Sequence, residues 1–182
     1  MRLFTAIDIP SDVKAALAAL IDRLRPLAKL HWIPVEKLHI TTKFIGEWPD
    51  KPETRLDELT RALSAVRSSG PVEIAIRRIG WLPNPRSARM LYAGVESNDA
   101  LTALAAATEQ AAAGVGVAVE DRIFRPHVTL ARTRKRVPLD ALKQALAEIE
   151  LSSIGSYRAF SFALYLSAAG KYTKLQEFSL NP

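Results

Sequence analysis

The residues best suited to chemistry in this chain are two histidines, each followed two positions later by a threonine. His39 precedes Thr41 and His127 precedes Thr129, and β-branched and apolar residues surround both pairs. Such runs are typical of mostly buried strands. Because side chains two positions apart on a strand point to the same face, each imidazole is expected beside a hydroxyl.

Two histidines in one site suit acid–base chemistry near neutral pH, because one can accept a proton while the other donates one. Cleavage of a phosphodiester by water needs this division of roles. Threonine hydroxyls, with nearby arginine or lysine, can hold the non-bridging oxygens and offset the charge that develops on them. The pattern therefore predicts a phosphodiester-cleaving site that needs no metal or other cofactor.

Other interpretations of His39 and His127 fit the sequence less well. Zinc normally has three or four protein ligands, and no third histidine lies at helix or strand spacing in a chain without cysteine. The sequence also lacks the Gly-x-Ser-x-Gly elbow of serine hydrolases and the Gly-x-x-x-x-Gly-Lys phosphate loop. A purely structural role would require the two histidines to be far apart or sealed from solvent.

The spacing of the two motifs indicates an internal repeat. The second motif begins 88 residues after the first in a chain of 182 residues. The same offset relates the apolar segment 3–8 to the segment 91–96. We therefore expect one domain, 1–182, with two pseudo-repeat lobes of roughly 1–85 and 86–182.

Hydrophobic periodicity and turn residues predict the elements that position the motifs. Strands are expected at residues 2–8, 38–46, 72–79, 88–95, 117–120, 123–131, 158–166 and 174–180. Helices are expected at residues 12–27, 53–68, 99–113 and 139–150. Ser11 and Asn98 are predicted to cap the first and third of these helices.

Composition is that of an ordinary globular protein, with 48% hydrophobic and 24% charged residues. The 25 Lys and Arg exceed the 19 Asp and Glu, and the net charge of +6 favours a polyanionic partner. A merely basic surface would give the same total. No signal peptide or membrane span is visible, so a cytoplasmic location is expected.

The motifs and their surroundings resemble those of the two-histidine (2H) phosphoesterase superfamily, and within it the RNA 2',3'-cyclic phosphodiesterases, historically called 2'-5' RNA ligases. The resemblance covers nearly the whole chain. It rests on the segments RLFTAIDIP at 2–10, LHITTKFIGE at 38–47 and FRPHVTLAR at 124–132, with Trp32, Leu166, Ser167, Gly170 and Tyr172.

This resemblance implies an α+β fold of two pseudo-symmetric lobes, each an antiparallel β-sheet flanked by helices, around a central cleft. It implies hydrolysis of RNA 2',3'-cyclic phosphate ends to 2'-phosphates. The residues themselves predict no cofactor, and no membrane contact or obligate protein partner is evident from the sequence. By the same resemblance, His39 matches the proton donor and His127 the proton acceptor. Thr41 and Thr129 match the hydroxyls that hold the phosphate.

Three basic residues near the motifs are candidate RNA contacts. Lys43 and Arg125 share the strand parity of their motif histidines, so they are expected to point into the cleft. Arg132 has the opposite parity and begins a basic run, so it either contacts an RNA backbone or is structural. Candidates for stacking on a base, a role for which core packing is the common alternative, are Phe4, Tyr92 and Tyr172.

Several other functions fit the same motifs. The protein could be a 2'-5' RNA ligase or phosphodiesterase, or an enzyme that acts on a small cyclic nucleotide. It could also be a non-catalytic module that binds RNA ends, although binding alone has less need of two titrating histidines. Incubation with cyclic-phosphate RNA in EDTA separates these possibilities.

Overall fold

The computed structural model describes residues 1–48, 53–133, 137–149 and 154–180. One antiparallel sheet runs through it in the strand order β7-β4-β5-β6-β3-β1-β8-β9, and β2 pairs with β6 beside this path. The strands are β1 (Arg2–Asp8), β2 (His31–Trp32), β3 (His39–Glu47), β4 (Val72–Leu82), β5 (Met90–Val95), β6 (His127–Arg132), β7 (Gly155–Ala159), β8 (Ser161–Ala168) and β9 (Lys171–Ser179). The helices are α1 (Ser11–Leu24), α2 (Glu53–Ser64), α3 (Asp99–Gly114) and α4 (Asp140–Ala147), with short 3₁₀ turns at Arg25–Leu27 and Val35–Lys37.

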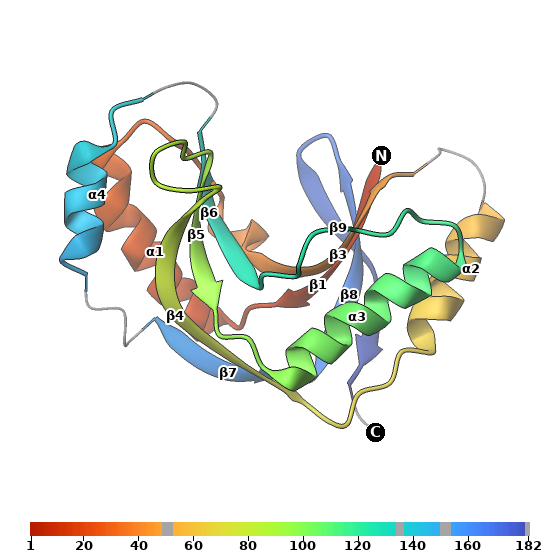
Figure 1. The fold of residues 1–182 in the computed structure, drawn as a ribbon. Helices are drawn as coiled ribbons and strands as arrows, with labels where there is room; N and C mark the ends of the chain where they lie inside the picture. The colour runs from red at the N-terminus through yellow and green to blue at the C-terminus, as the bar shows by residue number, and fades with distance from the viewer. Residues whose placement is uncertain (49–52, 134–136, 150–153, 181–182) are drawn as a thin grey trace.

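The sheet is narrowest at its centre, where β3 meets β6. Ile40 and Val128 are the register partners between these strands, whereas β1 and β3 are paired from Arg2 to Asp8. On either side of this junction the strands spread into two walls, formed by β6, β5, β4 and β7 and by β3, β1, β8 and β9 (Figure 1). The motif strands are therefore the two central strands of the sheet.

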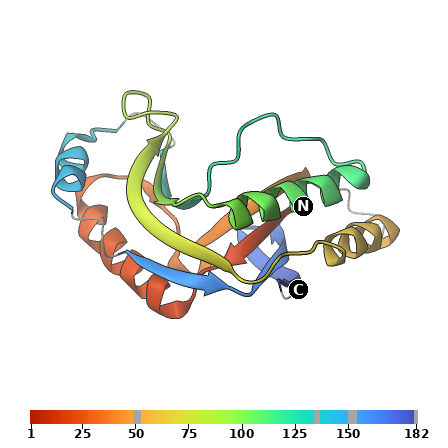
Figure 2. The same ribbon diagram turned by 60° about the horizontal axis from the view of Figure 1, so that its bottom comes forward.

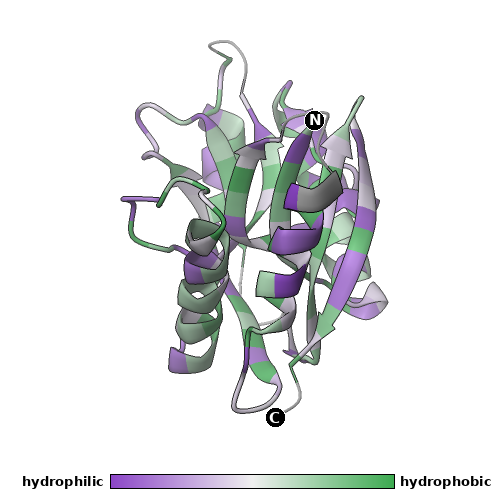
Figure 3. Cartoon of the chain, turned by 90° about the vertical axis from the view of Figure 1, so that its right-hand side faces the viewer, coloured by the Kyte–Doolittle hydropathy of each residue, from purple (hydrophilic) through white to green (hydrophobic). Residues whose placement is uncertain are grey.

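The helices cover the outside of these walls. α1 and α4 lie beside the wall that contains β4, and α2 and α3 lie beside the wall that contains β3 (Figure 1). The long β4 curves along the first wall (Figure 2), and its register with β5 shifts between Ile76 and Arg78. Hydrophobic and hydrophilic residues alternate along the strands, and the helices carry both kinds (Figure 3). Within the described residues, no helix is long and apolar enough to cross a membrane.

The α1 helix shows how the sequence pattern becomes packing. Its apolar face is buried at helical spacing, at positions Val13, Leu17, Leu20, Ile21 and Leu24. These side chains join one hydrophobic core that also contains the interior residues of the central strands. The helix thus follows β1 in the chain but supports the other wall, where it packs on β7.

Most expected elements are present, with local differences. The third helix is capped as predicted, because the Asn98 side chain accepts a hydrogen bond from the Leu101 backbone N–H. The predicted Ser11 cap is wrong, since α1 begins at Ser11 and its N-cap is Pro10. The strand expected at 117–120 is absent, and the one expected at 158–166 is two strands, β7 and β8, interrupted at Phe160.

The predicted α+β fold with antiparallel sheet flanked by helices is confirmed. Strands from both halves of the chain lie in each wall: β4 precedes residue 85 and pairs with β5, whereas β8 and β9 follow it and lie beyond β1. The division into pseudo-repeat lobes of about 1–85 and 86–182 stays a prediction.

Candidate active site

The two motif strands meet through the middle residues of their motifs. Ile40 of β3 and Val128 of β6 are antiparallel register partners, and both are fully buried. From each histidine onward, burial follows the same order: partly buried, buried, partly buried, buried, buried. Because side chains alternate along a strand, the two histidines emerge on the same face of one sheet.

This register gathers four side chains, which we call the motif square: His39, Thr41, His127 and Thr129. Extending the pairing by one residue on either side of the buried pair sets His39 opposite Thr129 and Thr41 opposite His127. Opposite residues have Cβ atoms about 5 Å apart, and diagonal residues are about 7–8 Å apart. The two imidazoles occupy a diagonal, which leaves space for one phosphate between them.

Both imidazole rings are held in the same way. The Nδ1 of His39 lies 2.7 Å from the carbonyl oxygen of Lys37. The Nδ1 of His127 lies 2.7 Å from the carbonyl oxygen of Arg125. A carbonyl oxygen only accepts, so each Nδ1 carries the hydrogen and each Nε2 is left for chemistry. The Nε2 of His39 lies 3.1 Å from the Oγ1 of Thr41.

Each motif strand carries a β-bulge directly after its threonine. The register between β1 and β3 skips Thr42, and the register between β5 and β6 skips Leu130. A bulge adds one residue and so reverses the alternation of side chains beyond it. Lys43 is consequently buried, at 3% exposure, whereas Arg132 is exposed. The unbroken alternation expected for these two residues is wrong.

Lys43 is engaged by protein acceptors rather than by the motif square. Its Nζ forms an ion pair with Glu109 of α3 and donates a 2.9 Å hydrogen bond to the carbonyl oxygen of Ala118. Glu109 also accepts a hydrogen bond from the backbone N–H of Glu120. The lysine thus joins β3 to α3 and to the segment after it, and its burial keeps the ammonium away from a substrate.

Aromatic rings surround the first histidine, in what we call the aromatic cluster: Phe4, Phe44, Tyr165 and Tyr172. The ring of Phe4 stacks on the imidazole of His39 with centroids 4.8 Å apart, and Tyr172 meets the same imidazole edge-on at 5.5 Å. Phe4 itself is buried, so it is a core residue. Phe44, which the sequence did not single out, is 56% exposed and stacks on Phe4 at 6.1 Å.

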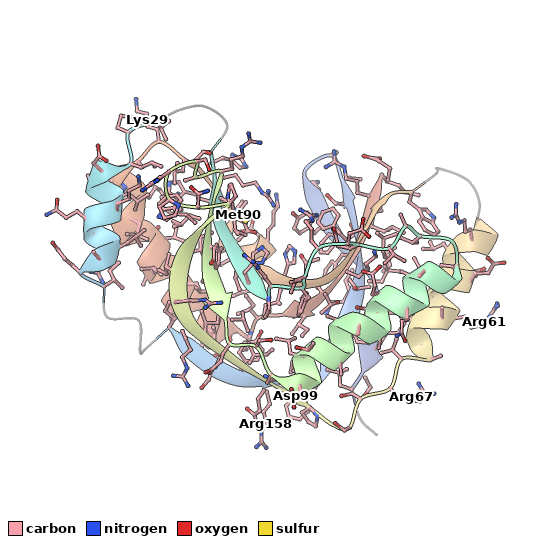
Figure 4. The ribbon with its side chains drawn as sticks, in the orientation of Figure 1. Lys29, Arg61, Arg67, Met90, Asp99 and Arg158 are labelled. Atoms are coloured by element: carbon pink, nitrogen blue, oxygen red, sulfur yellow. The ribbon has the colours of Figure 1, made fainter. Side chains whose placement is uncertain are left out.

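A different group borders the second histidine. A pocket of about 320 Å³, which we call the arginine pocket, lies against His127. Its lining consists of Arg78, Leu82, Tyr92, Arg125, Pro126 and His127. Side chains from both walls project over the central junction, whereas the labelled Arg61 and Arg67 point outward from the far side of the molecule (Figure 4).

Burial and neighbouring charges set the state of His39. Burial lowers the pKa of His39, and repulsion from His127 and Lys14 lowers it further. The hydrogen bond to Lys37 and the charge of Asp8 act in the opposite direction, although the pKa stays below its ordinary value. Asp8 is the register partner of His39 on β1 and forms a 2.7 Å ion pair with Lys174.

The charged surroundings of His127 differ from those of His39. Burial lowers the pKa of His127, the hydrogen bond to Arg125 raises it, and the positive charge of Arg132 lowers it. The bulge at Leu130 explains why Arg132 acts on this imidazole, because the arginine returns to the face that carries the motif square. A carboxylate thus acts on His39 together with positively charged groups, whereas a guanidinium acts on His127.

The chain resembles known proteins over almost its whole length. The family model described as the 2'-5' RNA ligase superfamily matches residues 12–155. An RNA 2',3'-cyclic phosphodiesterase of Thermus thermophilus is 31% identical, over 99% of this chain and 90% of its own. The chain belongs to the 2'-5' RNA ligase superfamily. The family predicted from the two motifs is thus confirmed.

Further known proteins are similar to this chain in sequence or in fold. An RNA 2',3'-cyclic phosphodiesterase of Methanothermobacter thermautotrophicus is 29% identical over 99% of both chains. The crystal structure of TT0787 from T. thermophilus covers 99% of this chain and 98% of its own at 28% identity, with a TM-score of 0.74. E. coli LigT complexed with 3'-AMP shares the fold, with a TM-score of 0.74 at 24% identity over 98% of this chain and 97% of its own.

The four residues of the motif square were predicted from the sequence, but two residues that lie near them were not. Arg78 lies near the expected end of a strand, and only the pairing of β4 with β5 reveals its place beside His127. Phe44 was not predicted as a site residue because the bulge at Thr42 turns its side chain outward. In the described ranges of the chain, no three His, Asp or Glu side chains gather in a way that could hold a metal ion.

Proposed function

We propose that this protein hydrolyses the 2',3'-cyclic phosphate at the end of an RNA strand and leaves a 2'-phosphate. The observation that carries the proposal is the motif square, in which His39 and His127 lie diagonally across one antiparallel junction with a threonine opposite each. The relatives named RNA 2',3'-cyclic phosphodiesterase support the same substrate. The net charge of +6 suits an RNA partner.

The reaction uses the Nε2 atoms of both imidazoles, because a backbone carbonyl holds each Nδ1. His127 takes a proton from water through its unprotonated Nε2, and the water oxygen forms a bond to phosphorus. The bond between phosphorus and the 3'-oxygen breaks, and His39 gives that oxygen its Nε2 proton. The product carries a 2'-phosphate and a 3'-hydroxyl. Diagonal imidazoles suit this step, because the entering and leaving oxygens lie on opposite sides of phosphorus.

The charges beside each imidazole support this choice of acid and base. Asp8 favours the protonated form of His39, as a general acid requires. Arg132 favours the neutral form of His127, as a general base requires. This difference between Asp8 and Arg132 supports the donor and acceptor roles that the resemblance implies.

The threonines are placed to hold the non-bridging oxygens of the phosphate. Thr129 donates to the sulfur of Met90 at 3.4 Å, a weak acceptor that a charged phosphate oxygen readily replaces. Thr41 lies against the Nε2 of His39, so its hydroxyl is next to the proton that the leaving oxygen receives. Arg132, whose charge acts on His127, adds positive charge near the same oxygens. RNA ends are thus the proposed partner, and a cytoplasmic location stays a prediction from the sequence.

An end-group assay in EDTA tests the proposal. An RNA oligonucleotide ending in a 2',3'-cyclic phosphate is incubated with the protein. The position of the phosphate on the terminal ribose of the product, 2' or 3', is then determined by ³¹P NMR. We expect a 2'-monophosphate at an undiminished rate in EDTA. Formation of a 3'-phosphate would contradict the roles of the two histidines, and loss of activity in EDTA would contradict metal independence.

The same assay addresses the alternatives. Joining of a cyclic-phosphate end to a 5'-hydroxyl end would reveal 2'-5' ligation, in which the 5'-hydroxyl of the second strand attacks phosphorus in place of water. Rapid turnover of small cyclic nucleotides with no action on RNA would favour a cyclic-nucleotide enzyme. Tight binding of the RNA end without turnover across neutral pH would favour a binding module.

A further inference from the structure

The arginine pocket is built by a row of residues that crosses three strands. Arg78 of β4 is the register partner of Gly94 of β5, and Gly94 is the partner of His127 of β6. A Cβ atom placed on Gly94 would lie 2.5 Å from the Cγ of Arg78 and 2.7 Å from its Nε. The arginine side chain therefore lies flat across the backbone of β5, in the space that the glycine leaves open.

The neighbouring row repeats this arrangement in the opposite direction. Tyr92 of β5 is the register partner of Gly80 of β4. A Cβ atom on Gly80 would lie 2.6 Å from both Cζ and Oη of the Tyr92 ring. The tyrosine thus lies across β4 while Arg78 lies across β5, and both line the same pocket. Two glycines on adjacent strands are needed for this crossing, which fixes the positions of both side chains.

The pocket carries positive charge without a compensating carboxylate. Among the described residues, no Asp or Glu forms an ion pair with Arg78 or Arg125. The adjacent Arg77, by contrast, is paired with Glu96 at 3.5 Å. Two guanidinium groups around one pocket favour an anion that accepts paired hydrogen bonds, and a phosphate does so.

The position of the pocket indicates which phosphate of the RNA binds there. The Cα atoms of Arg78 and His127 are two strand spacings apart, roughly 10 Å, so the guanidinium spans much of the distance to the reacting centre. An RNA end with a cyclic phosphate has its nearest other phosphate on the 5'-oxygen of the same terminal nucleotide. We propose that Arg78 and Arg125 bind this second phosphate, so that the enzyme selects polynucleotide ends over isolated nucleoside cyclic phosphates. This inference rests on the proposed function and specifies its substrate.

Four substrates test it: a nucleoside 2',3'-cyclic phosphate, the same with a 5'-phosphate, a dinucleotide with a terminal cyclic phosphate, and that dinucleotide with a neutral methylphosphonate linkage. The kcat/KM of the wild-type protein is expected to be about ten- to hundredfold higher for the charged dinucleotide than for the neutral one, as for a charge-assisted contact. A 5'-phosphate that outperforms the dinucleotide would identify a monoester as the preferred source of the charge.

Variants of the two arginines test whether the preference for the charged linkage depends on the arginine pocket. Arg78→Met and Arg125→Met are each expected to reduce the preference for the charged linkage to a fewfold. Arg61→Met on α2, which removes the same charge far from the pocket, is expected to keep the full preference. Circular dichroism confirms that each variant is folded, and either pocket variant suffices if the other fails to fold.

The outcomes separate the two proposals. Equal kcat/KM for the charged and neutral dinucleotides in the wild-type protein, with both converted to 2'-phosphates, overturns the second-phosphate site and leaves the proposed function standing. An undiminished preference in both arginine variants also overturns it. Failure to hydrolyse any of the four substrates overturns the proposed function, and the inference falls with it.

Discussion

The two histidines of this protein have the same local sequence pattern and different surroundings. Each begins a strand, donates through Nδ1 to the carbonyl two residues earlier, and precedes a threonine and a bulge. Around His39 lie stacked aromatic rings and the carboxylate of Asp8. Around His127 lie the arginine pocket and Arg132. One repeated motif thus places two imidazoles beside different charged residues, which suits the acid and base roles that we propose for them.

Removal of either imidazole is the strongest way to break this comparison. His39→Ala and His127→Ala are each expected to lower kcat/KM by about 10²–10⁴-fold, the usual contribution of a general acid or base. The wild-type pH profile is expected to be bell-shaped. The His127 variant should lose the acidic limb and the His39 variant the alkaline limb, as measured by kcat/KM against pH. Full activity of either variant would remove that histidine from catalysis.

Removal of the hydroxyls tests whether the two sides hold the phosphate equally. Thr41→Val and Thr129→Val keep the branched shape and delete one donor each, so a loss of about 10–100-fold in kcat/KM is expected. Steady-state kinetics on a cyclic-phosphate RNA gives the comparison. Thr133→Val, which deletes a hydroxyl bonded to the carbonyl oxygen of Ala88, is the matched control and should be close to wild type in activity.

Changes of the charged neighbours sharpen the comparison without removing either imidazole. The negative charge of Asp8 raises the pKa of His39, so Asp8→Asn should lower that pKa and move the alkaline limb to lower pH. The positive charge of Arg132 lowers the pKa of His127, so Arg132→Met should raise that pKa and move the acidic limb to higher pH. Movement of the acidic limb in Asp8→Asn and of the alkaline limb in Arg132→Met would reverse the assignment of acid and base.

Lys43 provides the smallest expected effect on activity. Lys43→Met leaves the partly exposed Glu109 without its buried partner, so the free energy of unfolding should fall by about 2–3 kcal/mol. The KM for RNA should stay close to the wild-type value, because the ammonium lies away from the motif square. Urea denaturation measures the first quantity and steady-state kinetics the second. A large rise in KM with unchanged stability would return Lys43 to the RNA-binding residues.

The sequence predicted the four residues of the motif square but not the residues that border them. Histidine, threonine and flanking apolar residues fix a strand and its exposed face through local alternation, so the motif square could be predicted. The bulges at Thr42 and Leu130 could not, because an extra residue in one strand is defined only by its partner strand. Arg78 was missed for the same reason, since its path depends on a glycine 16 positions away in the chain.

The helices and turns show the same limit. Asn98 was recognisable as a cap because its side chain bonds to a backbone group three residues later. The segment 117–120 has the composition of a strand, yet it is held by the Lys43 side chain at Ala118 and by Glu109 at Glu120. Those contacts come from β3 and α3, so the sequence of the segment itself does not predict them.

The fully buried pair at the narrow centre of the sheet, Ile40 and Val128, also governs geometry on the opposite side. Ile40 and Val128 form the register pair that joins β3 to β6, so the packing of these two side chains in the core fixes how the two motif strands are set against each other. Two buried residues thereby act as a spacer for the two imidazoles on the other face, and a substitution that changes the size of either one is expected to change the separation of His39 and His127.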